Sequence, residues 1–331
     1  MKPRVLISND DGVVAPGLRA LARELHAQDF CDYSVCGPSG ERSAQSHCIT
    51  IGKHLHAFNI QVEGATEAFA VDGTPADSVM LALYGPLLSN PRFDLVVSGI
   101  NRGDNCGLHV IYSGTVGAAR EAACKDIPAI AFSLDNHHAR SEDQYATAAK
   151  YAVAIIKSAL GIYTSPNSTS PDPHHRPLVS LRGHVLNVNF PGAEHHIEDE
   201  YYKGMCLTFQ GQHCTFPDFR EVDADPHFQY EEHHNSPADG AASGTVVLRA
   251  FRNAAGFLRT DERPGSDSWA VRNGYVSFTV VGLSSDVDLR AEAEERKIDT
   301  SKLRPGVTDI IRGAAKELGL GGEHIKGLPS M

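Results

Sequence analysis

The sequence predicts an α/β protein built on a doubly wound, mainly parallel sheet. Short apolar segments of strand length alternate with segments of helical spacing through residues 5–190. Such alternation is typical of parallel strands that are buried on both faces and connected by helices. Hydrophobic residues make up 41% and charged residues 21% of the 331 residues. These shares exclude a disordered or a fibrous chain.

The elements can be assigned in chain order. The first strand covers residues 5–7 and ends in a polar turn. Pro16 then suits the first turn of a helix, in which apolar residues recur at helical spacing: Leu18, Leu21, Ala22 and Leu25. Further strands are predicted at residues 33–36, 93–99, 128–133 and 185–191, and further helices at 115–124 and 144–160.

The pattern changes after about residue 204. Residues 209–239 are polar, residues 245–248 and 275–281 resemble strands, and residues 308–318 predict a terminal helix. We therefore divide the chain into a catalytic domain, residues 1–203, and a C-terminal extension of β-hairpin and helix, residues 204–331. A segment with so few regularly spaced apolar residues cannot easily build its own core, and a bare strand edge invites pairing. We expect the extension to mediate a homodimer or homotetramer.

Charge and cysteine content narrow the class of protein. Lys and Arg number 30 against 41 Asp and Glu, a net charge of -11, which argues against a nucleic-acid polymer as partner. The seven cysteines are scattered without a C-x-x-C motif, so no disulfide framework is expected. No stretch approaches the ~18 apolar residues of a membrane span, and the N-terminal apolar run is too short for a signal peptide. We predict a cytoplasmic protein that does not bind a membrane.

The strongest chemical feature is a pair of adjacent carboxylates, Asp10 and Asp11, directly after the first strand. In open α/β sheets the carboxyl ends of the strands are where ligands bind. Two adjacent carboxylates repel each other, so a proton or a cation must compensate them. Their oxygens suit Mg²⁺, Mn²⁺ or Ca²⁺. Taken alone, the pair also fits a solvated turn that caps the next helix.

Two later segments add candidate ligand groups. Asn101 and Asn105 lie among glycines after the strand at 93–99; an Asn offers a neutral oxygen to a metal and an amide donor to a phosphate. Such a loop also fits an ordinary turn. A helix start follows whose free backbone N–H groups would bind an anion, although a plain helix cap has the same composition: Ser113, Gly114 and Thr115.

Taken together, these segments resemble the SurE family of survival-protein nucleotidases. The stretches that carry the resemblance are, in order, Val5–Leu18, Asp72–Val79, Ser98–Asn101, Tyr112–Ala119, Gly265–Asp267 and Gly274–Ser277. The resemblance implies a Rossmann-like nucleotidase fold and a divalent-metal phosphomonoesterase that acts on nucleoside monophosphates. It also implies dimers or tetramers with exchanged C-terminal elements.

The resemblance also implies roles for individual residues. The family's metal ligands fall on Asp10, Asp11, Ser43 and Asn101, and its phosphate contacts on Asn105, Ser113, Gly114 and Thr115. Asn9, beside the two carboxylates, joins the candidate substrate-binding residues. The loop before Ser43 departs from the family pattern, because Gly37–Ala44 lacks the usual Asp and Arg and has Ala44 for Gly. The spacing from Pro38 to Ser43 is kept, so Ser43 is the matching serine.

We therefore predict an enzyme in which Asp10 and Asp11 act on nucleoside 5′-monophosphates, with 3′-monophosphates as further candidate substrates. Two alternatives stay open: a broad acid phosphatase or exopolyphosphatase with the same site, and a non-catalytic nucleotide-binding scaffold. Three adjacent histidine pairs are expected not to bind a metal, because adjacent side chains do not usually converge on one ion: His174–His175, His195–His196 and His233–His234.

Overall fold

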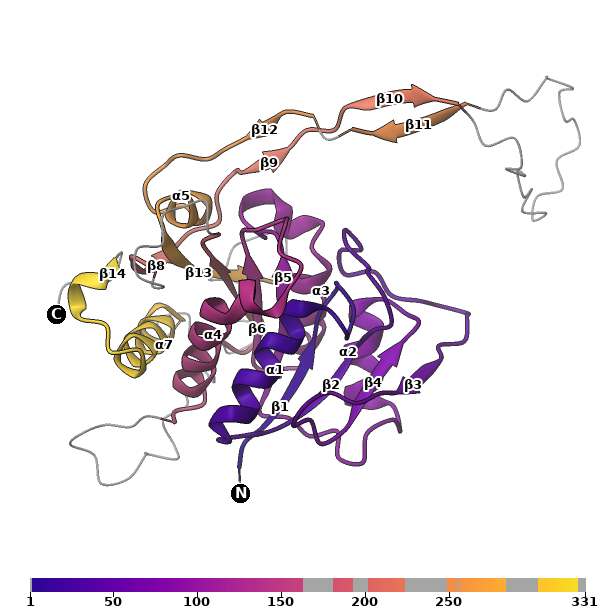
Figure 1. Cartoon of the computed structure of the whole chain (residues 1–331), viewed down its shortest axis with the longest axis horizontal. Helices are drawn as coiled ribbons and strands as arrows, with labels where there is room; N and C mark the ends of the chain where they lie inside the picture. The colour runs from indigo at the N-terminus through magenta and orange to yellow at the C-terminus, as the bar shows by residue number, and fades with distance from the viewer. Residues whose placement is uncertain are drawn as a thin grey trace, which may run out of the picture.

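The computed structural model describes residues 2–162, 181–192, 202–223, 249–254, 256–283 and 303–326 (Figure 1). Within these residues, ten strands form one sheet: β1 (Arg4–Ser8), β2 (Asp32–Pro38), β3 (Ala57–Asn59), β4 (Ala68–Val71), β5 (Leu95–Arg102), β6 (Ala129–Leu134), β7 (His184–Phe190), β8 (Gly204–Thr208), β13 (Tyr275–Gly282) and β14 (Ile325–Lys326). Their order is β14-β8-β13-β7-β6-β5-β1-β2-β4-β3. The predicted doubly wound α/β fold is confirmed, since β1 pairs in parallel with β2 and β5. Within this ten-stranded sheet, the antiparallel pairs are β13 with β7 and the edge strand β3 with β4.

Helices cover both faces of the sheet. One layer consists of α1 (Pro16–Gln28), α4 (Ala146–Ala159) and α7 (Leu303–Glu317), and the other of α2 (Pro75–Tyr84) and α3 (Gly114–Ala123). Because successive side chains of a strand point to opposite faces, Val5 and Ile7 pack with the first layer, and Leu6 packs with the second. No helix among the described residues is long and apolar enough to span a membrane.

Most predicted elements form within a few residues of their expected bounds. The structure adds elements that the apolar pattern did not indicate, including the short strands β3 and β4 and the helix α2, which a Thr74 capping box begins. The predicted strand at 245–248 and the three histidine pairs lie outside the described residues.

The C-terminal part contributes to the main sheet. The strands β8, β13 and β14 complete one edge, and α7 packs on α4, where the Ser158 hydroxyl donates to the Ile310 carbonyl at 2.9 Å and Lys157 pairs with Glu317 at 2.7 Å. Strands on both sides of residue 204 thus belong to one sheet. The division between a catalytic and an oligomerising part concerns function and stays a prediction.

A two-stranded ribbon leaves the body, as Figure 1 shows, and we call residues 214–259 the arm. Its described strands are β9 (Cys214–Thr215) paired with β12 (Leu258–Arg259), and β10 (Phe219–Val222) paired with β11 (Ala250–Asn253). Large apolar side chains of the arm are exposed, among them Phe216, Phe219, Phe251 and Phe257.

The first turn of α1 lies directly on the end of β5, and this contact generates a stability prediction. A Cβ added at Gly17 would lie 2.0 Å from the Ile100 carbonyl oxygen, so a side chain there must displace backbone. We expect Gly17→Ala to lower the free energy of unfolding by about 1–3 kcal/mol, measured by urea denaturation. Gly40→Ala is the control, because no atom lies within 4 Å of the added Cβ. Equal stability of both variants would contradict the close packing of α1 on β5.

Candidate active site

Asp10, Asp11, Asn101 and the start of α3 lie at the carboxyl edge of the sheet, near the ends of β1 and β5. Strand β1 has β2 on one side and β5 on the other. The chain after β1 therefore runs toward β2, whereas the chain after β5 runs the opposite way, toward β6. This reversal of strand order opens a crevice in which ligands of α/β proteins bind. Asp10 and Asp11 follow β1, and Asn101 lies near the end of β5.

Asp10 is buried against the start of α3. Its side chain is 3% exposed, and the Thr115 hydroxyl donates a hydrogen bond to Oδ1. A Cβ at Gly114 would lie 3.0 Å from Oδ2, so glycine allows the helix to begin this close to the carboxylate. Burial, together with the charge of Asp11, raises the pKa of Asp10 to about 7, although the hydroxyl and backbone N–H of Thr115 oppose the rise.

Asp11 is held by the end of β5. The Arg102 backbone N–H donates to Oδ2 at 2.9 Å, and the Arg102 guanidinium lies 4.0 Å from Oδ1. Burial raises the pKa of Asp11, while Arg102 opposes the rise. Arg102 also pairs with Glu41 at 2.9 Å, so this cation links Asp11 to the loop that carries Ser43.

The loop after β2 contacts the backbone of Asp10. The Arg42 N–H donates to the Asp10 carbonyl at 2.7 Å, while the exposed Ser43 donates its hydroxyl to Glu41 Oε1 at 3.1 Å. Asn101 donates its Nδ2 to the Gly103 carbonyl at 2.8 Å. This hydrogen bond leaves the Asn101 Oδ1 available as a neutral oxygen ligand.

Two further asparagines are fixed by the surrounding backbone. Asn9 donates Nδ2 to the Gly12 carbonyl at 2.7 Å, which closes the loop that carries both carboxylates. Its Oδ1 is buried without a hydrogen-bond partner among the described residues. Asn105 donates Nδ2 to the Ser133 hydroxyl and its backbone N–H to Asn189 Oδ1, both at 2.7 Å. Within the described part of the chain, one amide hydrogen of Asn105 has no acceptor and could bind a ligand.

The start of α3 uses its hydroxyls in two ways. Ser113 caps the helix by accepting the Val116 N–H at 3.0 Å, and its own hydroxyl hydrogen is left for a ligand. The Thr115 hydroxyl donates its hydrogen bond to Asp10 Oδ1. The sequence suggested Thr115 as a phosphate contact; in the structure its side chain orients the carboxylate.

The donor set fits a hard divalent cation. Asp10 and Asp11 are two adjacent carboxylates, and burial raises the pKa of both. The Asn101 Oδ1 would add a neutral oxygen, whereas the Ser43 hydroxyl is exposed and bonded to Glu41. Oxygen-only donors with two formal negative charges suit Mg²⁺ or Mn²⁺.

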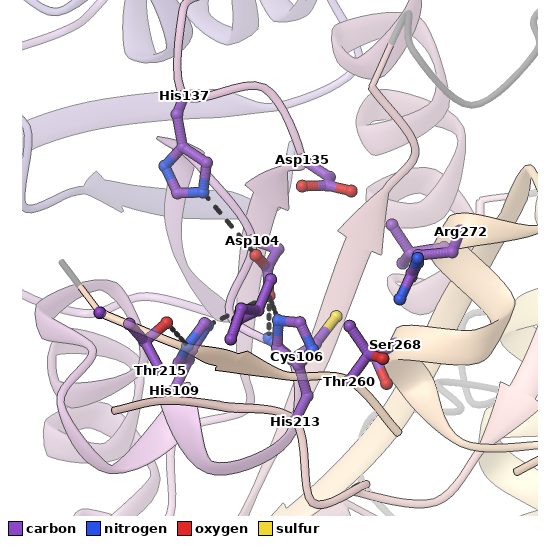
Figure 2. Close-up of a pocket in the computed structure, with 13 residues that line it drawn as sticks. Asp104, Cys106, His109, Asp135, His137, His213, Thr215, Thr260, Ser268 and Arg272 are labelled. Carbon is purple, nitrogen blue, oxygen red and sulfur yellow. Dashed lines mark hydrogen bonds and ion pairs between the residues drawn. The ribbon is translucent and has the colours of Figure 1, made fainter. Parts of the chain in front are cut away.

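A second polar cluster lies beside this site, and the sequence analysis missed it. Asp104 follows β5, His109 lies in the short helix η1 (Gly107–Ile111), and His213 directly precedes β9 (Figure 2). Burial disfavours the charged form of Asp104, but the nearby rings of His109 and His213 prevail and lower its pKa to about 2. The Asp104 carboxylate raises the pKa of His109, whereas burial lowers that of His213. The cluster lines a cavity of about 450 Å³.

No local pattern could have revealed this cluster. Asp104 and His109 lie within the Asn101–Thr115 stretch, but His213 lies far along the chain, in residues 211–213, which directly precede the arm and which we call its base. Its position depends on the packing of this base on η1, where the Leu108 N–H donates to the His213 carbonyl at 2.8 Å.

The sheet is doubly wound, and a carboxylate pair lies where its strand order reverses, facing the start of α3. These features define a Rossmann-like α/β protein with an acidic edge, at the position where such folds bind ligands. Residues 5–216 match the family model "Survival protein SurE". The chain belongs to the SurE family.

Related proteins support this membership along most of the chain. A protein of Thermus thermophilus named 5′-nucleotidase SurE 1 is 38% identical over 282 residues, which cover 85% of this chain and 92% of that one. A 5′-nucleotidase SurE of Acinetobacter baumannii is 36% identical over 285 residues, with coverage of 85% and 94%. The crystal structure of the SurE protein from Aquifex aeolicus superposes with a TM-score of 0.61 at 30% identity, covering 90% of this chain and all of that one.

The carboxylate pair predicts how this site binds a metal. We expect Asp10→Asn and Asp11→Asn each to weaken Mn²⁺ binding at least about tenfold, since each removes one formal charge from the ion. Isothermal titration calorimetry measures the affinity. In the presence of a chelator, Asp10→Asn should melt no lower than the wild type, because it relieves the buried repulsion.

Asp32→Asn is the matched control, because Asp32 is an exposed carboxylate at the opposite end of β2. Mn²⁺ affinity that is unchanged in both site variants, or equally weakened in the control, would contradict the assignment.

Proposed function

We propose that this chain is a metal-dependent phosphomonoesterase that hydrolyses nucleoside 5′-monophosphates to a nucleoside and inorganic phosphate. The observation that supports this most directly is the buried Asp10 carboxylate, which sits beside Asp11 and against the start of α3. A cation on the carboxylates and an anion at the helix start would then be neighbours. The related proteins of Thermus thermophilus and Acinetobacter baumannii are both named 5′-nucleotidases.

In this proposal Asp10, Asp11, Ser43 and Asn101 hold Mg²⁺ or Mn²⁺. When bound, such an ion polarises a phosphoryl oxygen and lowers the pKa of water. Arg102 supports the arrangement through its backbone N–H on Asp11. Asn9 shapes the loop of the two carboxylates through its bond to the Gly12 carbonyl.

The remaining phosphate oxygens are assigned to the start of α3 and to Asn105. The Ser113 hydroxyl and the backbone at Gly114 face the same edge as Asp10, and Asn105 keeps one amide hydrogen free. Donors that are fixed in advance stabilise the charge that develops on a phosphoryl group in the transition state.

Direct attack by water fits the geometry better than a covalent phosphoenzyme. Asp10 Oδ1 accepts the Thr115 hydroxyl, which in the proposed arrangement leaves one Asp10 oxygen for the cation and none for a covalent bond to phosphorus. We therefore assign to the carboxylate pair the orientation of the attacking water and the acceptance of its proton.

Phosphate release from a substrate panel tests the proposal. We expect nucleoside 5′-monophosphates to be hydrolysed with Mg²⁺ or Mn²⁺, and chelator to abolish turnover until the metal is restored. Asp11→Asn should lower kcat about a hundredfold or more, as does the loss of one preorganised electrostatic group. Thr115→Val should also slow hydrolysis, because Asp10 loses its hydroxyl donor, while Thr115→Ser keeps the donor and the rate.

The panel separates the alternatives. Sugar phosphates or polyphosphate hydrolysed as fast as nucleotides would favour a broad acid phosphatase or exopolyphosphatase. Nucleotide binding without release of phosphate under any metal condition would favour a non-catalytic scaffold. Full activity after exhaustive chelation would overturn the metal assignment.

We further propose a homo-oligomer in which the arm exchanges contacts between identical subunits, and a cytoplasmic location. Phe219, Phe251 and Phe257 lie exposed on the described arm, and a copy of the same chain would cover them.

Light scattering at micromolar concentration measures the oligomeric state. We expect the wild type to exceed the monomer mass of 35.7 kDa. Deletion of residues 219–253 should give a folded monomer, because the Ala254 N–H already lies 2.7 Å from the Asp218 carbonyl and the chain can close there. A wild-type mass near 35.7 kDa, or a deletion variant that stays oligomeric, would refute the role of the arm.

A further inference from the structure

The Asp104 cluster has the composition and spacing of a metal site that is separate from the carboxylate pair. Its three candidate ligand atoms lie within 4.8 Å of one another. Asp104 Oδ1 is 3.5 Å from His109 Nδ1 and 3.9 Å from His213 Nε2. Figure 2 shows both rings turned toward the carboxylate at the wall of the cavity.

These separations match ligands that share an ion better than ligands that bond to one another. Protein N–H···O hydrogen bonds usually measure about 2.7–3.2 Å, and both distances exceed that range. Tetrahedral ligands on bonds of about 2.0–2.1 Å stand roughly 3.3 Å apart. A displacement of well under 1 Å, estimated roughly from that ideal spacing, would bring the three atoms onto one ion.

The outer contacts orient the ligands. His109 bonds through Nε2 to the Thr215 hydroxyl at 3.0 Å, which leaves Nδ1 to face Asp104. The Cys106 N–H donates to Asp104 Oδ1 at 2.9 Å. Metal-binding histidines characteristically use their second ring nitrogen in such a bond.

His213 is the candidate ligand that comes from outside the loop after β5. The residue is 6% exposed, and its Nε2 faces Asp104 Oδ1 at 3.9 Å, a distance beyond a hydrogen bond. An ion between His213 Nε2 and Asp104 would give both groups a direct partner.

The fold holds this arrangement firmly. Gly107 has a φ of 54°, and a Cβ there would lie 2.5 Å from the His213 backbone nitrogen, so the glycine permits the base of the arm to lie on η1. The buried Asp267 connects η1 to the base of the arm, because its carboxylate accepts the Gly107 N–H at 2.8 Å and the Gly211 N–H at 2.9 Å.

We propose that Asp104, His109 and His213 bind a divalent ion of the zinc class, with one coordination position open to the cavity. Two imidazoles and one carboxylate suit Zn²⁺ or Co²⁺ and not Mg²⁺ or Ca²⁺, which select oxygen-only sites. The ion ties the base of the arm to the loop after β5. It is chemically distinct from the hard ion proposed for Asp10 and Asp11, and its binding does not depend on phosphatase activity.

Metal titration of the full chain tests this site. We expect the chelator-treated wild type to bind Zn²⁺ and to give the visible absorption of four-coordinate Co²⁺. The Asp10→Asn/Asp11→Asn variant should retain that signal. His213→Gln should lose it and weaken Zn²⁺ binding at least about tenfold, and Thr215→Val, which removes only the outer partner of His109, should weaken it about 10–100-fold.

The matched control is His56→Gln, because His56 pairs with Asp72 at 2.6 Å on the surface without a third ligand. Melting curves in chelator establish that each variant folds. Zn²⁺ affinity that is unchanged in both His213→Gln and Thr215→Val would overturn the site. So would loss of the Co²⁺ signal in the Asp10→Asn/Asp11→Asn variant with retention in His213→Gln. Failure of the proposed phosphatase would leave these outcomes unaffected, since they measure binding alone.

Discussion

The position of the Asp10 carboxylate constrains the structure around it. The side chain lies between the end of β1 and the first turn of α3, almost wholly out of water. An ionised carboxylate in such a place raises the free energy of the fold unless donors or a cation compensate it. The hydroxyl at Thr115 and the absence of a side chain at Gly114 follow from this one placement. Asp11 adds a second carboxylate beside it, and burial together with this charge raises the pKa of Asp10.

The end of β5 serves two sites because its ladder with β6 is irregular. The register shifts between Ser98 and Asn101 and resumes with Asn101 opposite Ser133. Such an irregularity re-aims the side chains that follow it. The Arg102 N–H then faces Asp11, whereas Asp104 turns toward His109 in η1 and toward His213. A few residues of one strand end thereby supply ligand groups to two neighbouring clusters.

The fold class and the carboxylate pair could be predicted because their determinants are local. Buried parallel strands are continuous apolar runs, and Asp10, Asn101 and Ser113 lie in short segments that end or begin an element. The strands β8 and β14 could not be predicted, since they are defined by pairing with distant partners. The same holds for His213, which the folding of the arm carries to Asp104. The bond from the Thr115 hydroxyl to Asp10 could not be predicted either, because sequence cannot tell which neighbour a hydroxyl in the first turn of a helix will bond.

The two clusters are linked through one stretch of chain, residues 101–115. Its beginning is bound to Asp11, its end to Asp10, and its middle to the base of the arm through Asp267. A ligand that tightens the middle therefore restricts the segment on which both carboxylates depend, without touching them. Because one cluster offers only oxygen donors and the other mainly imidazole nitrogens, the same ion does not favour both. The two clusters thus differ in donor chemistry but lie on one stretch of backbone. The same stretch contacts the base of the arm through Asp267 and carries the hydrogen bonds to Asp10 and Asp11.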